Sequence, residues 1–320
     1  MKTIGVLTSG GDAPGMNAAV RSVVRTAIAL GMNVKGIRKG YNGLIEGDII
    51  DLDVRSVSDI LKRGGTFLYT ARSPRFKTEE GIQEAIETCK KEGIEGIVVI
   101  GGDGSYRGAR DLSERGIPCV GIPGTIDNDI TSTDYTIGFD TAMNTAMEMV
   151  DKIRDTAQSH DRCSVVEVMG RHAGYLALQT GIAVGATAVL VPEVEVDIKS
   201  ITDKILETKK TGKEHFIIVV AEGYKTKAQE LAKQIQETTG IESRATVLGH
   251  VQRGGSPSVR DRVMATEMGY FAVQLLNKGI GNRVICYHKG QIMDRDIFEA
   301  LQMQKTIDPV RFEIANVTSI

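Results

Sequence analysis

The chain reads Ile97-Val98-Val99-Ile100-Gly101-Gly102-Asp103-Gly104-Ser105, an apolar run that ends in a glycine-rich turn. Consecutive valines and isoleucines, without polar residues between them, indicate a strand buried on both faces, as in a parallel sheet between helices. Similar apolar runs alternate with helical patterns along almost the whole chain. This alternation predicts an α/β fold with two doubly wound, mostly parallel-sheet domains of three-layer α/β/α character.

The expected elements follow from the same patterns. Strands are expected at Ile4–Thr8, Val34–Arg38, Ile94–Ile100, Pro118–Ile122, Ser164–Met169, Ala188–Val191, Phe216–Ala221, Ala245–Leu248 and Arg283–Tyr287. Helices are expected at Met16–Ala29, Glu79–Lys91, Asp140–Thr156, Ala173–Ala183, Asp197–Thr208, Ala228–Thr238 and Arg260–Asn277. No Pro/Ser-rich linker is present, so two domains would require the chain to cross between them more than once. The stretch after Asp308 has too weak a pattern to predict an element.

The composition is that of an ordinary globular protein, and it excludes several classes. The chain has 320 residues, of which 41% are hydrophobic and 25% charged, with a net charge of -2. There is no long basic run, which argues against partners such as nucleic acid or a membrane surface. The four cysteines form no C-x-x-C pair, so neither a disulfide framework nor a zinc site is expected. The first apolar stretch is too short for a signal peptide, and these features predict a cytoplasmic protein.

Two glycine-rich turns offer main-chain amides to an anion. In Gly101–Ser105, bare backbone at Gly104 leaves room for a phosphate, and Asp103 is a candidate Mg²⁺ ligand. The alternative is an aspartate that only caps the following helix. The turn Gly10–Gly15 leads into a helix and would also attract an anion. Neither turn is a Walker A loop or a dinucleotide-binding fingerprint.

A second polar segment, Pro123–Asp129, follows the next predicted strand and carries a hydroxyl and two carboxylates. An extended chain would point Thr125, Asp127 and Asp129 to one side. Asp127 is the candidate general base that takes the proton of an alcohol, with the other two orienting the reacting groups. The alternative is an Asx-type loop. With the phosphate turns, this segment predicts phosphoryl transfer to a hydroxyl.

Isolated charged residues complete the candidate site. Arg72 lies in a loop with no helical face and would stabilise charge on a transferring phosphoryl group, or else is a solvated surface arginine. Glu222 follows an apolar run and would accept hydrogen bonds from sugar hydroxyls, or else caps a helix. A phosphorylated acceptor also needs its own anion site, made of cations or else matched only by surface ion-pair residues. The cationic candidates near strand ends are Arg162, Arg171, Arg244, His250 and Arg253.

These segments closely resemble the bacterial phosphofructokinases over essentially the full length of the chain. The matching segments are Leu7–Asn17, Gly101–Ser105, Pro123–Asp129, Met169–Arg171, Ala221–Gly223 and Leu248–Gly255. The Pro123–Asp129 segment is highly specific, whereas the Gly-Gly-Asp-Gly turn also occurs in NAD and lipid kinases. The resemblance implies transfer of the γ-phosphoryl of MgATP to the 1-hydroxyl of D-fructose 6-phosphate in glycolysis, with Asp127 as general base.

The resemblance also implies the site residues and the assembly. The ATP set is Gly11, Tyr41, Arg72, Ser73, Gly102, Asp103, Gly104, Ser105 and Gly108, with Asp103 serving Mg²⁺. The substrate set is Thr125, Asp127, Asp129, Arg162, Met169, Gly170, Arg171, Glu222, Arg244, His250 and Arg253. From the two sets together, the resemblance implies that Arg72, Thr125 and Arg171 take part in catalysis with Asp127. Arg162 and Arg244 match residues that reach across from a neighbouring subunit, which implies a homotetramer. The implied domains are residues 1–138 plus 252–302 for ATP, and 139–251 plus 303–320 for fructose 6-phosphate.

An effector site for ADP and phosphoenolpyruvate is implied at a subunit interface. The matching residues are Arg21, Arg25, Arg154, Gly185, Lys213 and His215. Two positions depart from the family pattern, because a usual acid is here Thr187 and a usual arginine is here Thr211. We therefore expect reduced sensitivity to both effectors.

Two other functions are considered. A pyrophosphate-dependent enzyme is disfavoured, because such relatives usually carry an acid where this chain has Gly104 and a lysine where it has Gly124. A nucleotide-sensing protein without catalysis would not need both the metal aspartate and the acceptor carboxylates. An assay comparing the two phosphoryl donors separates the first alternative from ATP-dependent transfer.

Overall fold

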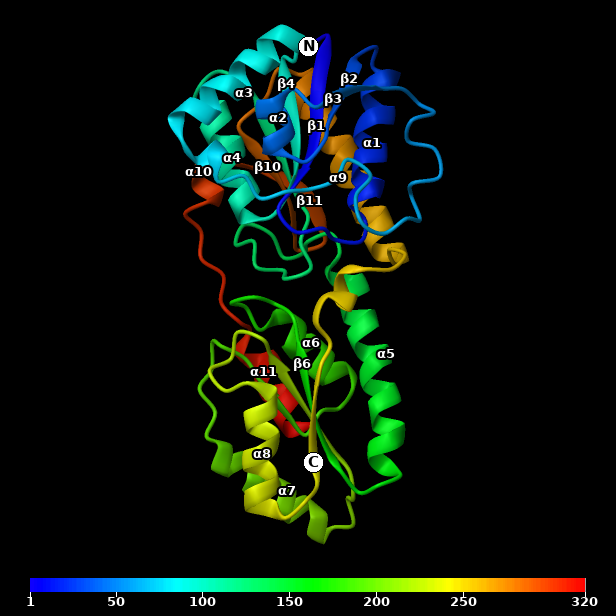
Figure 1. Ribbon diagram of the computed structural model, residues 1–320, viewed down its shortest axis with the longest axis vertical. Helices are drawn as coiled ribbons and strands as arrows, with labels where there is room; N and C mark the ends of the chain where they lie inside the picture. The colour runs from blue at the N-terminus through cyan, green and yellow to red at the C-terminus, as the bar shows by residue number, and fades with distance from the viewer. Residues whose placement is uncertain (320) are drawn as a thin grey trace. The chain divides into compact units, whose positions relative to one another are not determined.

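The computed structural model describes residues 1–319 and divides into two compact units (Figure 1). Unit 1 comprises Met1–Thr141 and Arg253–Lys305. Unit 2 comprises Ala142–Gln252 and the residues from Thr306 onward. The chain crosses between the units three times, close to the expected crossings at residues 138, 251 and 302.

Unit 1 contains a 7-stranded sheet in the order β11-β10-β5-β4-β1-β2-β3. The parallel strands are β1 (Thr3–Ser9), β2 (Asn33–Ile37), β4 (Gly96–Gly101), β5 (Cys119–Pro123) and β10 (Arg283–His288). The antiparallel edge strands are β3 (Ile49–Leu52) and β11 (Gln291–Asp296). Every residue of β4 and β5 is buried, as expected for central strands covered on both faces.

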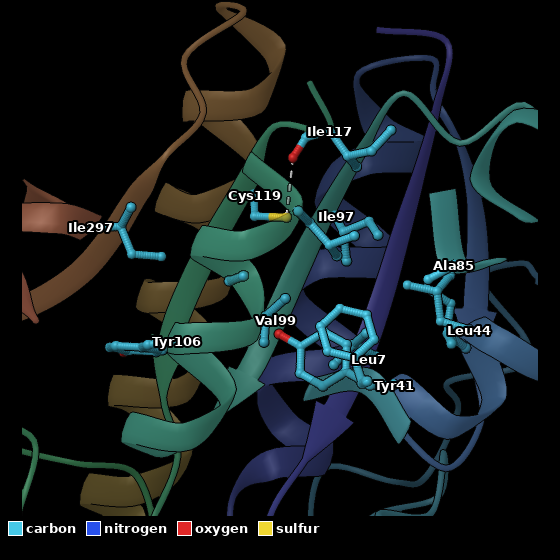
Figure 2. Close-up of a cluster of buried hydrophobic side chains, with 14 of the residues drawn as sticks. Leu7, Tyr41, Leu44, Ala85, Ile97, Val99, Tyr106, Ile117, Cys119 and Ile297 are labelled. Atoms are coloured by element: carbon cyan, nitrogen blue, oxygen red, sulfur yellow. Dashed lines mark hydrogen bonds between the residues drawn. The ribbon is translucent and has the colours of Figure 1, made fainter. Parts of the chain in front are cut away.

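Helices cover both faces of this sheet (Figure 1). On one face lie α1 (Met16–Ala29) and α9 (Val259–Asn277), which pack against each other. On the other lie α2 (Tyr41–Glu46), α3 (Glu79–Glu92), α4 (Asp103–Ser113) and α10 (Ile297–Ala300), with the short helix η1 (Arg75–Lys77) beside α2. Figure 2 shows the core beneath these helices, where Leu7, Ile97 and Val99 of the sheet meet Tyr41 and Tyr106 of the helices.

Unit 2 contains a 4-stranded parallel sheet in the order β7-β8-β6-β9. Its strands are β6 (Cys163–Val168), β7 (Ala188–Leu190), β8 (Phe216–Ala221) and β9 (Ser243–Val247). Its helices are α6 (Tyr175–Ala183), α7 (Ile198–Lys210), α8 (Ala228–Thr239) and α11 (Pro309–Val317). The remaining elements are α5 (Phe139–Gln158) and η2 (Gly249–Arg253), each containing a crossing between the units. The α/β fold with two mostly parallel sheets is therefore confirmed.

All the predicted strands and helices are present, with ends shifted by a few residues. The sequence patterns missed the edge strands β3 and β11 and the short helices α2 and α10. They also left α11 unassigned, although Asp308 caps it by accepting a hydrogen bond from Val310 N at 2.9 Å. Among residues 1–319, no helix has the length and apolar character needed to cross a membrane.

Candidate active site

The turns after β1, β4 and β5 meet at one edge of the sheet in unit 1. These strands are parallel neighbours, with Ser9 paired to Gly101 and Gly101 paired to Pro123. The amide of Gly124 donates to the carbonyl of Gly101 at 3.0 Å. A Cβ built on Gly102 would lie 4.0 Å from the side chain of Thr125. The two segments that the sequence analysis singled out are therefore side by side, at the edge where parallel sheets bind ligands.

The turn after β4 depends on a glycine at the last residue of the strand. A Cβ on Gly101 would lie 2.4 Å from Oγ of Ser105, which donates to the carbonyl of Ser9 at 3.1 Å. Gly102 is the N-cap of α4, and no side chain caps the helix. The free amides and the helix dipole at this end of α4 make it an anion-binding position.

Asp103 begins α4 and is half-exposed at the same turn. Its carboxylate pairs with Nε of Arg107 at 3.0 Å. A Cβ on Gly104 would meet no atom within 4 Å, so the space above this residue is open. Among residues 1–319, no group of three or more His, Cys, Asp or Glu side chains is arranged to hold a metal ion. One carboxylate beside an anion site fits Mg²⁺, which is commonly held by one or two carboxylates and by substrate phosphate oxygens.

Tyr41 supports α4 from the side of the core. Its Oη donates to the carbonyl of Ser105 at 2.6 Å, and its ring stacks on Phe76 with centroids 4.1 Å apart. A Cβ on Gly108 would lie 2.6 Å from this ring, so the glycine lets the two elements approach closely. Burial raises the pKa of Tyr41 well above its usual value. A contact between Tyr41 and ATP stays a prediction.

The loop that carries Arg72 is tied to the end of β1. Thr70 Oγ1 donates to the carbonyl of Gly10 at 2.9 Å, and Thr8 Oγ1 donates to that of Tyr69 at 2.7 Å. Ser73 Oγ accepts from the amide of Phe76 at 3.2 Å. Arg72 itself is exposed. These bonds bring the loop to the same sheet edge as the glycine turns.

Arg253 contacts the first glycine turn. Its Nη1 donates to the carbonyl of Asp12 at 3.0 Å, and a Cβ on Gly11 would lie 2.7 Å from the same atom. The sequence analysis assigned Arg253 to the sugar phosphate together with His250. In the structure Arg253 belongs to unit 1, whereas His250 is an exposed residue of unit 2.

The acceptor segment is buried and bent. Asp127 is 2% exposed and Thr125 is 8% exposed. The expectation of an extended segment was wrong, because the chain bends at residues 126 and 127 and Asn128 has a φ of 51°. Thr125 Oγ1 accepts from the amide of Asp127 at 3.2 Å. The local turn, instead of strand alternation, therefore sets the direction of the carboxylates.

The chain that returns from this segment holds it in place. Thr125 N donates to the carbonyl of Ile137 at 3.1 Å, and Thr136 Oγ1 donates to that of Thr125 at 2.6 Å. Asp261 of α9 is fully buried and accepts from the amide of Gly138 at 2.7 Å. Sequence reasoning missed Asp261, because its partners lie more than a hundred residues away in the chain.

Unit 2 gathers a second polar group at the carboxyl ends of β6 and β8. Val168 pairs with Ala221, so the residues that follow the two strands are neighbours. Glu222 Oε1 accepts from the amide of Arg171 at 2.7 Å. Gly170 and Arg171 both have positive φ, 138° and 56°, which turns the chain sharply after Met169. The exposed Arg171 side chain is thus available for an anion.

Arg162 and Arg244 lie at the opposite end of the same sheet. Both form ion pairs with Glu242, Arg162 at 2.8 Å and Arg244 at 2.9 Å. The hydrogen bond from Arg162, and then that from Arg244, lower the pKa of the Glu242 carboxylate. Arg162 directly precedes β6, and Arg171 follows it by three residues. A strand of 6 residues spans about 20 Å. The structure therefore does not bring Arg162 and Arg244 together with Arg171 within one chain.

The expected effector residues form two separate groups. In unit 1, Arg21 and Arg25 of α1 line a surface pocket of ≈ 450 Å³ with Arg55, Lys62 and Arg262. Burial, and then the charge of Arg25, lower the pKa of Arg21. Sequence reasoning missed the other three cations, because the segment around Arg55 and Lys62 has no regular pattern.

In unit 2, Arg154 donates to the carbonyl of Val184, next to Gly185. Burial and the neighbouring charges of Arg154 and Lys213 lower the pKa of His215, so these three side chains are close together.

The two positions that depart from the family pattern have internal partners. The Thr187 amide donates to the carbonyl of Ile217 at 2.7 Å, and its side chain is buried. Thr211 Oγ1 donates to the carbonyl of Thr208 at 2.7 Å. Neither threonine supplies charge to the group around Arg154.

Comparison with known proteins gives consistent results. The family model described as phosphofructokinase matches residues 3–276. The ATP-dependent 6-phosphofructokinase of Bacillus velezensis is 56% identical over 320 residues, covering 100% of both chains. That of Clostridium botulinum is 54% identical over 319 residues, also covering 100% of both chains.

A solved structure of phosphofructokinase from Saccharomyces cerevisiae has a TM-score of 0.90 and 35% identity. It matches 100% of this chain, which spans 48% of the yeast chain. The fold, the two adjoining turns and these full-length similarities agree. The chain belongs to the phosphofructokinase family.

Proposed function

We propose that this chain is an ATP-dependent 6-phosphofructokinase. It transfers the γ-phosphoryl of MgATP to the 1-hydroxyl of D-fructose 6-phosphate, giving fructose 1,6-bisphosphate and ADP in glycolysis. The observation that carries this proposal is the adjacency of the turns after β4 and β5, since Gly101 pairs with Pro123. An anion site and a buried carboxylate at the same edge are what phosphoryl transfer to an alcohol needs.

The donor lies over the glycine turns of unit 1. The uncapped amides at the start of α4 bind phosphate oxygens. Asp103 would hold Mg²⁺, which would supply positive charge to the phosphate oxygens. Arg72 stabilises the negative charge on the transferring group. The remaining ATP contacts are Gly11, Tyr41, Ser73, Gly102, Gly104, Ser105 and Gly108.

The structure offers a physical argument for ATP over pyrophosphate. A Cβ at Gly104 would meet no protein atom within 4 Å, so close packing does not explain the glycine there. An acid at this position would repel the nucleotide's α-phosphate. At Gly124, a Cβ would lie 3.1 Å from Met16 and 3.2 Å from Ile100, so a lysine would need its neighbours to shift.

Asp127 is the general base. Its carboxylate takes the proton of the 1-hydroxyl as that oxygen forms a bond to the γ-phosphorus, and the bond to the bridging oxygen of ADP breaks. Its burial excludes water from the reacting oxygen. Thr125 and Asp129 orient the acceptor, and Arg171 binds the developing anion.

Fructose 6-phosphate is bound mainly by residues of unit 2. The proposed substrate residues of unit 2 are Met169, Gly170, Arg171, Glu222 and His250, and those of unit 1 include Asp129 and Arg253. Because Arg162 and Arg244 lie at the opposite sheet end, they serve the active site of a neighbouring subunit. This division supports a homotetramer with shared active sites.

The domains take separate roles in this proposal. Residues 1–138 and 252–302 bind ATP, and residues 139–251 and 303–320 bind fructose 6-phosphate. ADP and phosphoenolpyruvate act at the groups around Arg21 and Arg154. Weak responses are expected, since Thr187 and Thr211 supply neither the acid nor the cation usual there. A cytoplasmic location stays a prediction.

A coupled assay of fructose 1,6-bisphosphate tests the proposal. The purified chain is supplied with fructose 6-phosphate, Mg²⁺ and either ATP or pyrophosphate, with and without ADP and phosphoenolpyruvate. We expect turnover with ATP alone, dependence on Mg²⁺ and small effector responses. Turnover with pyrophosphate only would establish the other donor, and binding of ATP without transfer would identify a sensor.

A further inference from the structure

Lys305 connects the last stretch of unit 1 to the acceptor segment. Its Nζ donates to the carbonyl of Asn128 at 2.7 Å and to that of Thr133 at 3.0 Å. Lys305 is also the last residue of unit 1 before the chain crosses to unit 2. One ammonium thus joins a C-terminal crossing segment to two points of the loop between β5 and α5.

The two carbonyls belong to opposite arms of that loop. Asn128 separates the base Asp127 from Asp129 and has a φ of 51°, in the left-handed region. Thr133 lies on the arm that returns toward Ile137. The amide group of Asn128 also donates to the carbonyl of Asp134 at 3.3 Å. Without the lysine, two carbonyls of buried residues would lose a charged donor.

Charged groups around Lys305 favour the ammonium form, and burial opposes it. Asp129 and Asp134 are the acids that act on it, and both belong to the same loop. Asp134 additionally lies 3.1 Å from the ring of His288 and accepts from the amide of Lys289 at 3.1 Å. Burial dominates and lowers the pKa of Lys305 to about 8. The side chain is therefore charged at neutral pH and loses its charge at mildly alkaline pH.

We propose that Lys305 is a positioning residue that holds the Asp127–Asp129 turn in the geometry needed for phosphoryl transfer. It acts through the Asn128 carbonyl and does not touch the substrate. This inference rests on the proposed function, because it gives Asp127 the task of a base. A base must lie within hydrogen-bond reach of its proton, and a displacement of about 1 Å can cost roughly 100-fold in rate.

A purely structural role is the competing explanation. A lysine that only satisfies buried carbonyls would change stability, and the rate would fall only with the folded fraction. A positioning role instead lowers kcat in folded protein and makes kcat follow the charge on Lys305. The kcat–pH profile of the fully folded enzyme separates the two explanations.

The experiment compares Lys305→Met, Lys305→Arg and the control Lys90→Met, which removes an exposed lysine of α3. For the native chain, kcat should fall as the pH rises through about 8. Lys305→Met should lower kcat about 10- to 100-fold at pH 7 and remove this alkaline limb, with KM for ATP nearly unchanged. Lys305→Arg keeps the charge at all accessible pH values, so it should recover most of kcat and lack the alkaline limb near pH 8.

Hydrogen–deuterium exchange without substrates gives a readout that does not depend on activity. Amides of residues 125–137 should exchange faster in Lys305→Met than in the native chain, while those of α3 should not change. If the native chain transfers no phosphoryl group from ATP, the proposed function is wrong. The exchange result would still test whether Lys305 holds the loop between β5 and α5 in place. The inference would be overturned if Lys305→Met had the same kcat and the same amide exchange rates as the native chain. It would also be overturned if the alkaline limb of the kcat–pH profile stayed near pH 8 in Lys305→Arg.

Discussion

The carboxyl edge of the unit 1 sheet and the charged groups of unit 2 offer an anion different kinds of partner. In unit 1 the proposed anion site is the uncapped start of α4 after Gly102, where main-chain amides would bind phosphate. In unit 2 the anion-binding groups are arginine side chains, with Arg171 at one sheet end and Arg162 and Arg244 at the other. In the proposed function, the main-chain site therefore needs one chain, whereas the side-chain site would need a second copy of it.

The largest expected effect tests Asp127, at the carboxyl edge of the unit 1 sheet. Asp127→Ser removes the base while leaving both phosphate-binding regions in place. We expect kcat to fall about 10³-fold with KM for both substrates changed little, because general-base catalysis contributes on that scale. Steady-state kinetics measures the effect, and Asp51→Ser, at an exposed carboxylate, is the control. A kcat within threefold of native would remove Asp127 as the base.

The next prediction tests whether the nucleotide binds in the open space at Gly104. Gly104→Asp adds a charge at a position where a Cβ would meet no protein atom within 4 Å. We expect kcat/KM for ATP to fall about 100-fold through repulsion of the phosphates. The melting temperature should not fall, since an acid in the first turn of α4 is favourable. Gly104→Ala is the matched control and should lose only a few-fold; an equal loss in both variants would contradict the electrostatic argument.

A smaller effect tests whether the unit 2 arginines serve another subunit. Arg162→Ala should raise KM for fructose 6-phosphate about tenfold, because a charged hydrogen bond to the phosphate is lost. Refolding Arg162→Ala together with Asp127→Ser should then create some sites that contain both native residues. Recovery of activity above that of either variant alone is the expected result. No recovery in mixed oligomers would mean that each chain uses its own Arg162.

The last prediction concerns stability instead of activity, through the charge on Lys305. Its pKa is lowered from 10.5 to about 8 in the folded chain, so between these values the unfolded chain binds more protons. The free energy of unfolding of the native chain should therefore rise with pH over this window, relative to Lys305→Met. The rise should be on the order of 3 kcal/mol and absent below pH 8. Urea unfolding of both proteins between pH 7 and 10.5 measures it, and parallel pH dependences would contradict the assignment.

Much of the fold could be predicted from the sequence, because the central strands are uniformly apolar and end in glycine turns. The edge strands were missed for the opposite reason. β11 reads Gln291-Ile292-Met293-Asp294-Arg295-Asp296 and is only partly buried, so it lacks a strong apolar signal. The cap at Asp308 and the following Pro309 did carry a helix-start signal for α11, which weak periodicity obscured.

The parts of the proposed site that lie within one short segment could be predicted from the sequence. The parts that depend on contacts between distant segments could not. The turn after β4 and the Pro123–Asp129 segment were both identified, and strand pairing brings them together. The bend at Asn128 was missed, because strand alternation was extended beyond the end of β5. Lys305 was missed as well, since a single lysine in an unpatterned stretch gives no indication of a partner 177 residues away.

The most direct test of the account is a crystal structure with Mg²⁺, a non-hydrolysable ATP analogue and fructose 6-phosphate. We predict the terminal phosphoryl group over the start of α4, with Mg²⁺ on Asp103. The sugar 1-hydroxyl should then lie within about 3 Å of the Asp127 carboxylate. A nucleotide bound away from Gly101–Ser105, or a sugar hydroxyl out of reach of Asp127, would contradict the account.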